Sequence, residues 1–501
     1  MTTLREQALA PMSRADAERL LPTLSGGRQT LERRVLHARC LKYLESFDIA
    51  WAELAAVLPQ LRDPALAARV ATDLIHLAYY LVRGGEVRRL ERIAERHAPS
   101  DPLMLAELRL GSSINATAAN EVTAALRDAR WAEDALSAAP RGRSRDLVAT
   151  RVSRQLAHLL SHAGDHTAAR LAAEATARNA ARVGDAWDIA WGTYTSGFVE
   201  WLAGNTERAA EDFAKAESGL RSYGSSVWRY TLLCLARARM ERGELAEGDR
   251  LARQSATGGP EDLAHLALLR GEADVAERIL DRAGKGLPPD EHFRSLVRGI
   301  VHAQRGDPRR GVRLLDEAAK EFESRGMGYW ALGAALHAAF WRERLVRGAG
   351  AARAVQLVRE VASRGAQGFA YYLPEVGVWA GRAAERAGVA RDTARVLRAA
   401  GEAALRRAES DAAIPVGASA LDDATFHLRT LGLTWREIAI LRELEQLRGE
   451  GPHIEREVLA KRLGVRPNTL RVHLTRIRAK LDVGDRRGDE VLLEAALRPL
   501  S

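Results

Sequence analysis

The 501-residue chain contains little cysteine, little proline and no long hydrophobic run. Its two cysteines, Cys40 and Cys234, are too few and too far apart in sequence for a disulfide framework, so we expect two buried free thiols in a reducing compartment. No apolar run approaches the ~18 residues of a membrane span, and the N-terminus lacks a basic region followed by an apolar core. We therefore expect a cytoplasmic protein that does not enter a membrane.

The motifs of common enzymes and metal proteins are also missing. The 13 histidines are scattered, without a His-Glu-x-x-His motif, and there is no Cys-x-x-Cys, so neither a zinc hydrolase nor a zinc finger is indicated. The Gly-x-Ser-x-Gly motif and the nucleotide-binding P-loop, Gly-x-x-x-x-Gly-Lys-Ser/Thr, are absent. We expect no catalytic residue, no metal site, no cofactor and no enzymatic activity.

The composition favours an ordered helical chain of more than one domain. Hydrophobic residues make up 47% of it and charged residues 28%, with only 16 prolines. Because 501 residues exceed what one hydrophobic core supports, we expect two or more domains or an elongated repeat array. Between about Thr30 and Ser410 the chain is rich in Ala, Leu, Arg and Glu, and no period-two run predicts a strand. These features predict an all-α fold.

A short pattern recurs through this long first part: Gly, then a polar residue, then Ala or Leu at helical spacing. The glycines that begin it are Gly164, Gly204, Gly243, Gly271 and Gly306, which lie 28 to 40 residues apart. Each Gly would end one helix in a left-handed cap, and the polar residue after it would start the next. This period predicts helical hairpins stacked into a solenoid, whose concave surface would bind a protein, peptide or small effector.

One copy of the pattern resembles a known repeat. The segment from Gly204 to Phe213, with Trp201 just before it, is similar to the middle of the tetratricopeptide motif, and the other copies match loosely. The resemblance implies a tetratricopeptide-like helical repeat domain over residues 30–410, after an N-terminal segment at 1–29. The aromatic-rich segments at 187–201, 329–341 and 369–379 would line its groove or, as aromatics at helical spacing often do, form its core.

Positive charge is concentrated near the C-terminus. From Pro452 to Arg487 there are ten cations and four anions, so this short window holds six of the chain's nine net positive charges. Polyanion binding would explain such a cluster, and so would a solvated charged face. The stretch before it, from Asp411 to Ser419, contains Pro, Gly and Ser without helical periodicity, which predicts a linker at 411–433 and a separate domain at 434–501.

Three helices are predicted in this domain. Thr434 and Glu437 form a capping box for the first, whose apolar stripe is Ile438, Leu441, Leu444 and Leu447. The second runs from about Glu455 to Leu463 with Val458, Leu459 and Leu463 facing inward, and Gly464 supplies the turn after it. The third begins at Pro467 and buries Leu470, Leu474, Ile477 and Leu481. A tight Gly-containing turn before a cationic helix is typical of a helix-turn-helix.

The segment from Gly464 to Leu481 resembles the LuxR-type helix-turn-helix, as do the start at Leu433-Thr434-x-x-Glu437 and a fourth helix after Val483. The resemblance implies double-stranded DNA as a partner. It places Arg471, Val472 and Thr475 against base edges and Asn468, Thr469, Arg476 and Lys480 on phosphates. The fourth helix often mediates dimerisation in that family, so a homodimer stays open.

The segment between the first two helices, Gly449 to Leu459, is longer than the usual LuxR-type linker. Together with residues 472–481 it also resembles the OmpR-type winged helix, but that fold requires a strand hairpin where residues 485–497 predict a helix. A sigma-factor-like module is a further relative. The missing P-loop separates this chain from LuxR-type regulators that carry an ATPase ahead of their repeats. The sequence thus predicts a transcription regulator controlled by its helical repeats. The alternative is a repeat scaffold with weak or no sequence-specific DNA binding.

Overall fold

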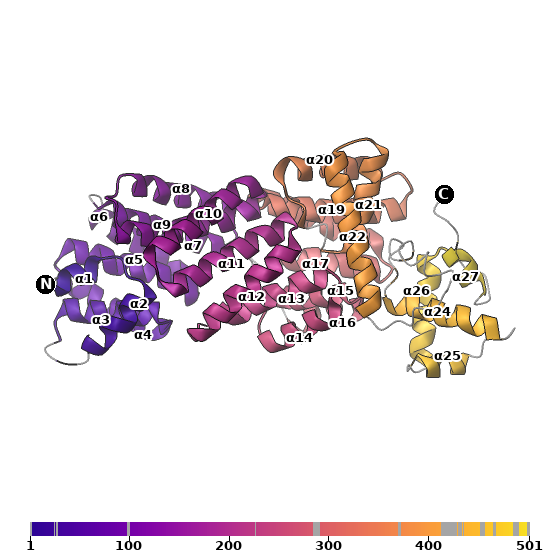
Figure 1. The fold of residues 1–501 in the computed structure, drawn as a ribbon, viewed down its shortest axis with the longest axis horizontal. Helices are drawn as coiled ribbons and strands as arrows, with labels where there is room; N and C mark the ends of the chain where they lie inside the picture. The colour runs from indigo at the N-terminus through magenta and orange to yellow at the C-terminus, as the bar shows by residue number, and fades with distance from the viewer. Residues whose placement is uncertain are drawn as a thin grey trace. The chain divides into compact units, whose positions relative to one another are not determined.

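The structure is a computed structural model that describes residues 3–24, 26, 29–97, 101–225, 227–283, 291–368, 372–411, 428, 433, 435–450, 456–463, 467–483 and 490–497. Every regular element within these residues is helical, as the sequence predicts (Figure 1). The chain divides into two compact units. The first comprises residues 1–203, 208–232 and 324–328, and the second comprises residues 204–207, 233–323 and 329–501.

The first unit is built from helices α1 to α12, with short 3-10 turns at Leu21–Leu24, Leu58–Gln60 and Gly84–Glu86. The α-helices are α1 (Leu4–Leu9), α2 (Arg14–Leu20), α3 (Leu31–Tyr43), α4 (Phe47–Val57), α5 (Pro64–Tyr80), α6 (Val87–His97), α7 (Pro102–Ala118), α8 (Val122–Ser137), α9 (Arg143–Ala163), α10 (His166–Val183), α11 (Ala186–Ala203) and α12 (Thr206–Ser222). Helix α13 (Val227–Glu241) contains the boundary to the second unit. The second unit continues with α14 (Leu245–Ser255), α15 (Pro260–Leu269), α16 (Ala273–Arg282), α17 (Glu291–Gln304), α18 (Pro308–Ser324), α19 (Gly328–Leu345), α20 (Ala351–Arg364), α21 (Pro374–Arg386), α22 (Arg391–Asp411), α24 (Trp435–Glu450), α25 (Arg456–Arg462), α26 (Pro467–Lys480) and α27 (Glu490–Leu497).

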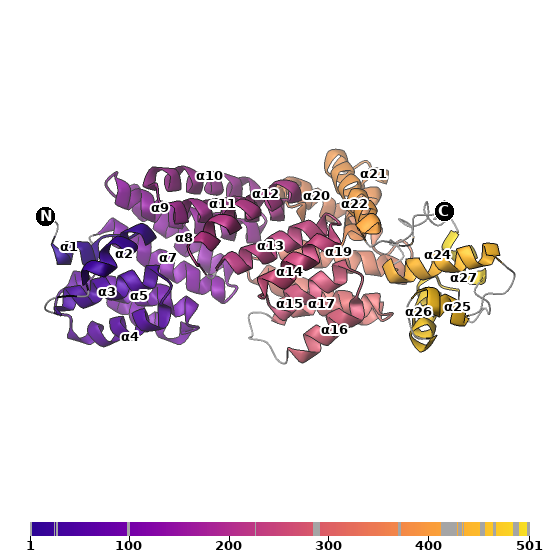
Figure 2. The ribbon, with the colours of Figure 1, turned by 60° about the horizontal axis from the view of Figure 1, so that its bottom comes forward.

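Consecutive helices pack in the manner of a repeat array. Helix α9 contacts α10, and α10 contacts α11, while α9 also contacts α11 directly (Figure 2). In the second unit α15 contacts α16 and α17, and α21 contacts α22. A helix that contacts both its neighbour and the next helix but one is the packing of a helical-hairpin solenoid. The predicted helical repeat architecture is therefore confirmed.

The left-handed glycines predicted between the repeats are confirmed, whereas the polar residue that follows does not cap every next helix: the side chains of Glu244 and Glu272 make no cap hydrogen bond. All five marker glycines have positive φ angles: Gly164 (86°), Gly204 (96°), Gly243 (87°), Gly271 (76°) and Gly306 (100°). At the first of them, the backbone N–H of Gly164 bonds back to Ser161, and the side chain of Asp165 then accepts from the Ala168 N–H at 3.0 Å. Gly164 ends one helix, because a glycine adopts the left-handed conformation without steric strain. Asp165 caps the next helix, because its carboxylate accepts a hydrogen bond from a backbone N–H in the first turn.

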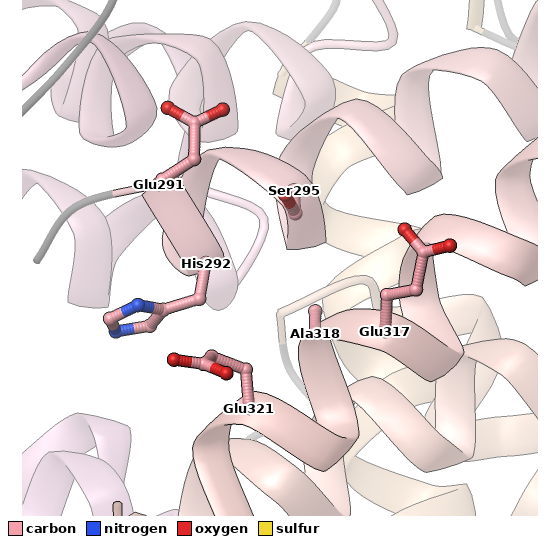
Figure 3. A pocket seen from close by; sticks show the side chains of 6 residues that line it. All are labelled: Glu291, His292, Ser295, Glu317, Ala318 and Glu321. Carbon is pink, nitrogen blue, oxygen red and sulfur yellow. The ribbon is translucent and has the colours of Figure 1, made fainter. Parts of the chain in front are cut away.

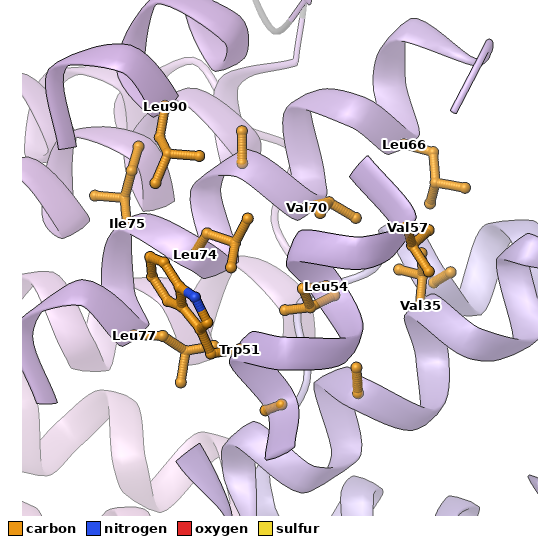
Figure 4. Packing of buried hydrophobic residues seen from close by; sticks show 14 of the residues in the cluster. Val35, Trp51, Leu54, Val57, Leu66, Val70, Leu74, Ile75, Leu77 and Leu90 are labelled. Atoms are coloured by element: carbon orange, nitrogen blue, oxygen red, sulfur yellow. The ribbon is translucent and has the colours of Figure 1, made fainter. Parts of the chain in front are cut away.

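The core of the first unit lies between helices α1 to α7 (Figure 4). Trp51 and Leu54 on α4 pack with Leu74 and Leu77 on α5, and Trp51 is 7% exposed. The N-terminal segment contributes to this core through Ala8, Met12 and Ala17. Such burial of apolar area is the main term that holds an array of this kind together.

Neither Cys40 nor Cys234 is part of a disulfide, and both are buried, as expected. Burial raises the pKa of the Cys40 thiol to about 11, so it stays protonated and behaves as a small apolar side chain. Among the residues that the structure describes, no helix is both long and apolar enough to cross a membrane.

Candidate nucleic-acid interface

The C-terminal helices pack on one another as a small group within the second unit. Helix α24 contacts α25, α26 and α27, and α25 contacts α26. The predicted stripe of α24 is confirmed, since Ile438, Leu441 and Leu444 are fully buried and Leu447 is 8% exposed. Helix α24 ends at Glu450, within the stretch from Gly449 to Pro452 that follows the predicted helix.

The inward face of α25 differs from the prediction. Leu459 is fully buried and Leu463 is half-buried, but Val458 is 37% exposed, and Ala460 is buried in its place. Leu459, Ala460 and Leu463, which directly follows α25, fall within an arc of about 100°, whereas Val458 lies about 160° from Ala460 and about 140° from Leu463. The placement of Val458 on the buried face is therefore wrong.

Helix α26 has one buried and one exposed face. Leu470, Leu474 and Ile477 are at most 2% exposed, and their spacing of four and three residues forms the stripe that packs on the other helices. Leu481 was predicted to extend this stripe, but it lies beyond the last residue of α26 and is only half-buried. The stripe thus fixes which side of α26 faces away from its neighbours.

The three residues predicted to face base edges lie on that outer side. Arg471, Val472 and Thr475 are all exposed, with Val472 at 47%. The Thr475 hydroxyl donates to the carbonyl of Arg471 at 3.0 Å, so the two side chains belong to one face of the helix. Asn468 and Thr469, predicted to contact phosphates, are exposed at the start of the helix.

The other two predicted phosphate contacts are engaged within the chain. Arg476 makes a two-pronged ion pair with Asp274 on α16: Nη1 lies 2.5 Å from Oδ2, and Nη2 lies 3.1 Å from Oδ1. Lys480 Nζ lies 2.7 Å from Oε2 of Glu437 on α24. The side chain of Lys480 is only 10% exposed, and that of Arg476 is 25% exposed.

Asp274 sits between two guanidinium groups. Arg305 donates from Nε to Oδ1 of Asp274 at 2.8 Å and also pairs with Glu277 on the same face of α16. Burial by itself would raise the pKa of Asp274, but the hydrogen bonds and charges of Arg476 and Arg305 hold it below its ordinary value. The same hydrogen bond raises the pKa of the Arg476 guanidinium.

Some predicted features lie outside the described residues. These are Thr434 of the capping box, the turn at Gly464, the segment between the first two helices from 451 to 455, and the linker at 411–433 apart from residues 411, 428 and 433. Asp274 was missed by the sequence analysis because it belongs to one of the recurring glycine patterns, Gly271 to Asp274, and carries no signal of its own. Its partner is 202 residues away.

The aromatic segments of the repeats are mostly core. Tyr194 and Trp201 pack with Phe213 at ring distances of 5.7 and 6.4 Å. Phe198 packs with Tyr194 and Trp201 at 6.3 and 6.0 Å, and all four rings are at most 7% exposed. Phe340, Trp341 and Trp330 are likewise buried. Of the two alternatives, a place in the core is therefore confirmed for these rings, whereas Trp187 and Trp191 are half-exposed.

A cavity of about 290 Å³ lies between α17 and α18 (Figure 3). Its walls are Glu291, His292, Ser295, Glu317, Ala318 and Glu321. Three carboxylates in so small a space would repel a polyanion, so the charge of this cavity disfavours a nucleic-acid ligand. Among the described residues, no three His, Cys, Asp or Glu side chains are grouped closely enough to hold a metal ion.

No protein-family model matches the sequence, and no curated protein matches it. Among solved structures, the chain is similar to a Rap protein complexed with Competence and Sporulation Factor. The sequence identity is 14%, the match covers 70% of this chain and 93% of that chain, and the TM-score is 0.42. This similarity assigns no ligand, partner or activity. What the fold defines is an all-α protein of stacked helical repeats with a compact group of helices at its C-terminus.

Proposed function

We propose that this chain is a DNA-binding transcription regulator whose C-terminal helices form a helix-turn-helix, with α26 as the recognition helix. In this proposal α26 enters the major groove of a duplex, and Arg471, Val472 and Thr475 contact base edges. The repeat array binds a protein, peptide or small effector and controls the helix. A cytoplasmic location goes with this role, and a homodimer on a palindromic site is one form that it can take.

The observation that carries the proposal is the outer face of α26. A helix buried along one side through Leu474 and Ile477 displays Arg471, Val472 and Thr475 on the other, in the most basic part of the chain. A guanidinium can pair with guanine, and Val can contact a thymine methyl group.

The helix α27 favours the LuxR-type arrangement over a winged helix. A winged helix requires a strand hairpin after its recognition helix, whereas residues Glu490–Leu497 are helical. Leu492, Leu493 and Ala496 are buried, and α27 contacts α24. A fourth helix after the recognition helix is what the LuxR-type resemblance implies.

The test is a binding selection with full-length protein on a randomised duplex library at low salt. We expect the wild type to enrich one motif. Arg471→Ala should lose preference at one base position by about 10- to 100-fold, as expected for one guanidinium–guanine contact. Arg406→Ala removes an exposed cation of α22 and serves as the charge-matched control that leaves the motif unchanged.

A scaffold without sequence-specific binding is the second candidate. The engagement of Arg476 and Lys480 within the chain favours it, because neither cation is available to a phosphate as the structure stands. If the library yields no motif, and Arg471→Ala binds random duplex as well as the wild type does, the scaffold replaces the regulator.

A further inference from the structure

The ion pair between Arg476 and Asp274 joins the proposed recognition helix to the repeat array. Arg476 lies on α26, directly after Thr475. Asp274 lies in the first turn of α16, which follows α15 and precedes α17 in the chain. Both terminal nitrogens of the guanidinium meet both oxygens of the carboxylate. An arginine binds a phosphate group through the same parallel pair of hydrogen bonds.

We propose that Asp274 occupies the place of a DNA phosphate and favours a state of α26 that binds DNA more weakly. We call Asp274, Glu277, Arg305 and Arg476 the α16 latch. This inference rests on the proposed function and adds its means of control: the latch must open before Arg476 can reach a duplex. Two anions thus compete for the guanidinium of Arg476: the carboxylate of Asp274 and a phosphodiester of the duplex.

Arg305 keeps the acidic side of the latch in place independently of α26. It bonds to Asp274 at 2.8 Å and pairs with Glu277, so the carboxylate is already oriented for Arg476. If the ion pair with Arg476 breaks, Asp274 still pairs with Arg305. Breaking the latch therefore leaves Asp274 with a cationic partner. The latch side chains are partly exposed, at 25% for Arg476 and 37% for Asp274. Partly exposed pairs of this kind are weak enough to be reversible.

The latch opposes DNA in two ways. First, Asp274 occupies the terminal nitrogens of Arg476, so they cannot bind a phosphate. Second, the carboxylates of Asp274 and Glu277 lie on the side of α26 that carries Arg476, and the phosphates of a duplex must approach this helix. Like charges brought together across an interface disfavour binding. By linkage, an effector that moves α16 away from α26 strengthens DNA binding, and DNA strengthens binding of that effector by the same factor.

The test compares full-length Asp274→Asn with Asp281→Asn, which removes the same charge from an exposed position on α16. Affinity is measured for a random-sequence duplex and for the selected motif, by fluorescence anisotropy at one fixed salt concentration. We expect Asp274→Asn to bind at least about fivefold more tightly than wild type, within the range typical of allosteric coupling. Asp281→Asn should stay within twofold of wild type, since it leaves every latch contact in place.

A double-mutant cycle with Arg476→Gln separates the latch from a general charge effect. In the Arg476→Gln background the latch is already gone, so Asp274→Asn should then change affinity less than twofold. Equal effects of Asp274→Asn in both backgrounds, or equality of the two Asn variants, overturn the latch and leave the proposed function standing. Absence of binding by the wild type and by both Asn variants overturns the proposed function and the latch together.

Discussion

Lys480 at the end of α26 donates from Nζ to Oε2 of Glu437 on α24 at 2.7 Å, and this pair ties the two helices together. The side chain of Glu437 is 2% exposed and that of Lys480 is 10% exposed. A carboxylate taken out of water in this way depends on its cationic partner. The LuxR-type resemblance predicts that Lys480 contacts a phosphate. In the structure this side chain instead holds α26 against α24.

Replacing Lys480 with Met should destabilise the C-terminal helices by about 3 kcal/mol, because it removes one partner of a buried ion pair. Hydrogen exchange of the peptides from α24 and α26 would measure the change. The double variant Lys480→Met with Glu437→Leu should recover most of the protection, since an apolar pair of similar volume can replace a buried ion pair. Unchanged exchange in Lys480→Met together with weaker DNA binding would instead make this lysine a phosphate contact.

Two apolar residues of α26 should behave oppositely. Leu474 is 2% exposed and Val472 is 47% exposed. Leu474→Ala should cost about 2 to 5 kcal/mol and increase exchange throughout the C-terminal helices. Val472→Ala should change stability by no more than about 0.5 kcal/mol. On the selected duplex it should weaken binding about fivefold, which corresponds to about 1 kcal/mol of lost apolar contact. Equal stability losses would show that the two faces of α26 are assigned incorrectly.

The features that the sequence predicts well are local. Gly164 ends one helix and Asp165 starts the next through hydrogen bonds within a few residues. The buried face of α26 is predicted by the spacing of Leu470, Leu474 and Ile477 alone. Such patterns need no knowledge of distant partners. They were enough to predict helices, repeats and the two faces of α26.

The features that the sequence could not supply depend on distant or neighbouring packing. Asp274 and Arg476 are 202 residues apart, and each looks like an ordinary charge on a helix surface. Lys480 has the same charge whether it meets a phosphate or Glu437, so only the position of α24 decides its role. Val458 was misplaced for a related reason, because seven residues of α25 give too few positions to fix a buried face.

Gly243 is expected to be far less tolerant of substitution than Gly306, although both have left-handed φ angles. A methyl group on Gly243 would lie 2.1 Å from the carbonyl oxygen of Ala404 on α22, whereas one on Gly306 would meet nothing within 4 Å. Gly306→Ala should therefore cost about 1 to 2 kcal/mol from backbone strain alone. Gly243→Ala should cost about 3 kcal/mol, because α22 must also shift. Urea unfolding of both variants measures the difference, and equal midpoints would contradict the packing of α22 on this turn.

A buried charge network should make the first unit sensitive to acid. Asp73 on α5 is 1% exposed and accepts from Arg39 Nε at 2.8 Å and from Lys42 Nζ at 2.5 Å. Burial would raise the pKa of Asp73, but Lys42, Arg39 and Arg69 together hold it well below its ordinary value. A carboxyl with a lowered pKa in the folded state adds stability above its unfolded pKa of about 3.9, and this stability is lost as the pH falls towards the folded value.

Asp73→Asn should accordingly lower the free energy of unfolding by about 3 kcal/mol at pH 7, because Lys42 and Arg39 lose a buried counter-charge. The gap between variant and wild type should narrow between about pH 5 and pH 3, where only the wild type has this proton to gain. Urea-unfolding midpoints across that range measure the effect, with Asp134→Asn on the exposed surface of α8 as the charge-matched control. A gap that stays constant down to pH 3 would mean that Asp73 acts through its shape and hydrogen bonds, with its ionisation contributing nothing.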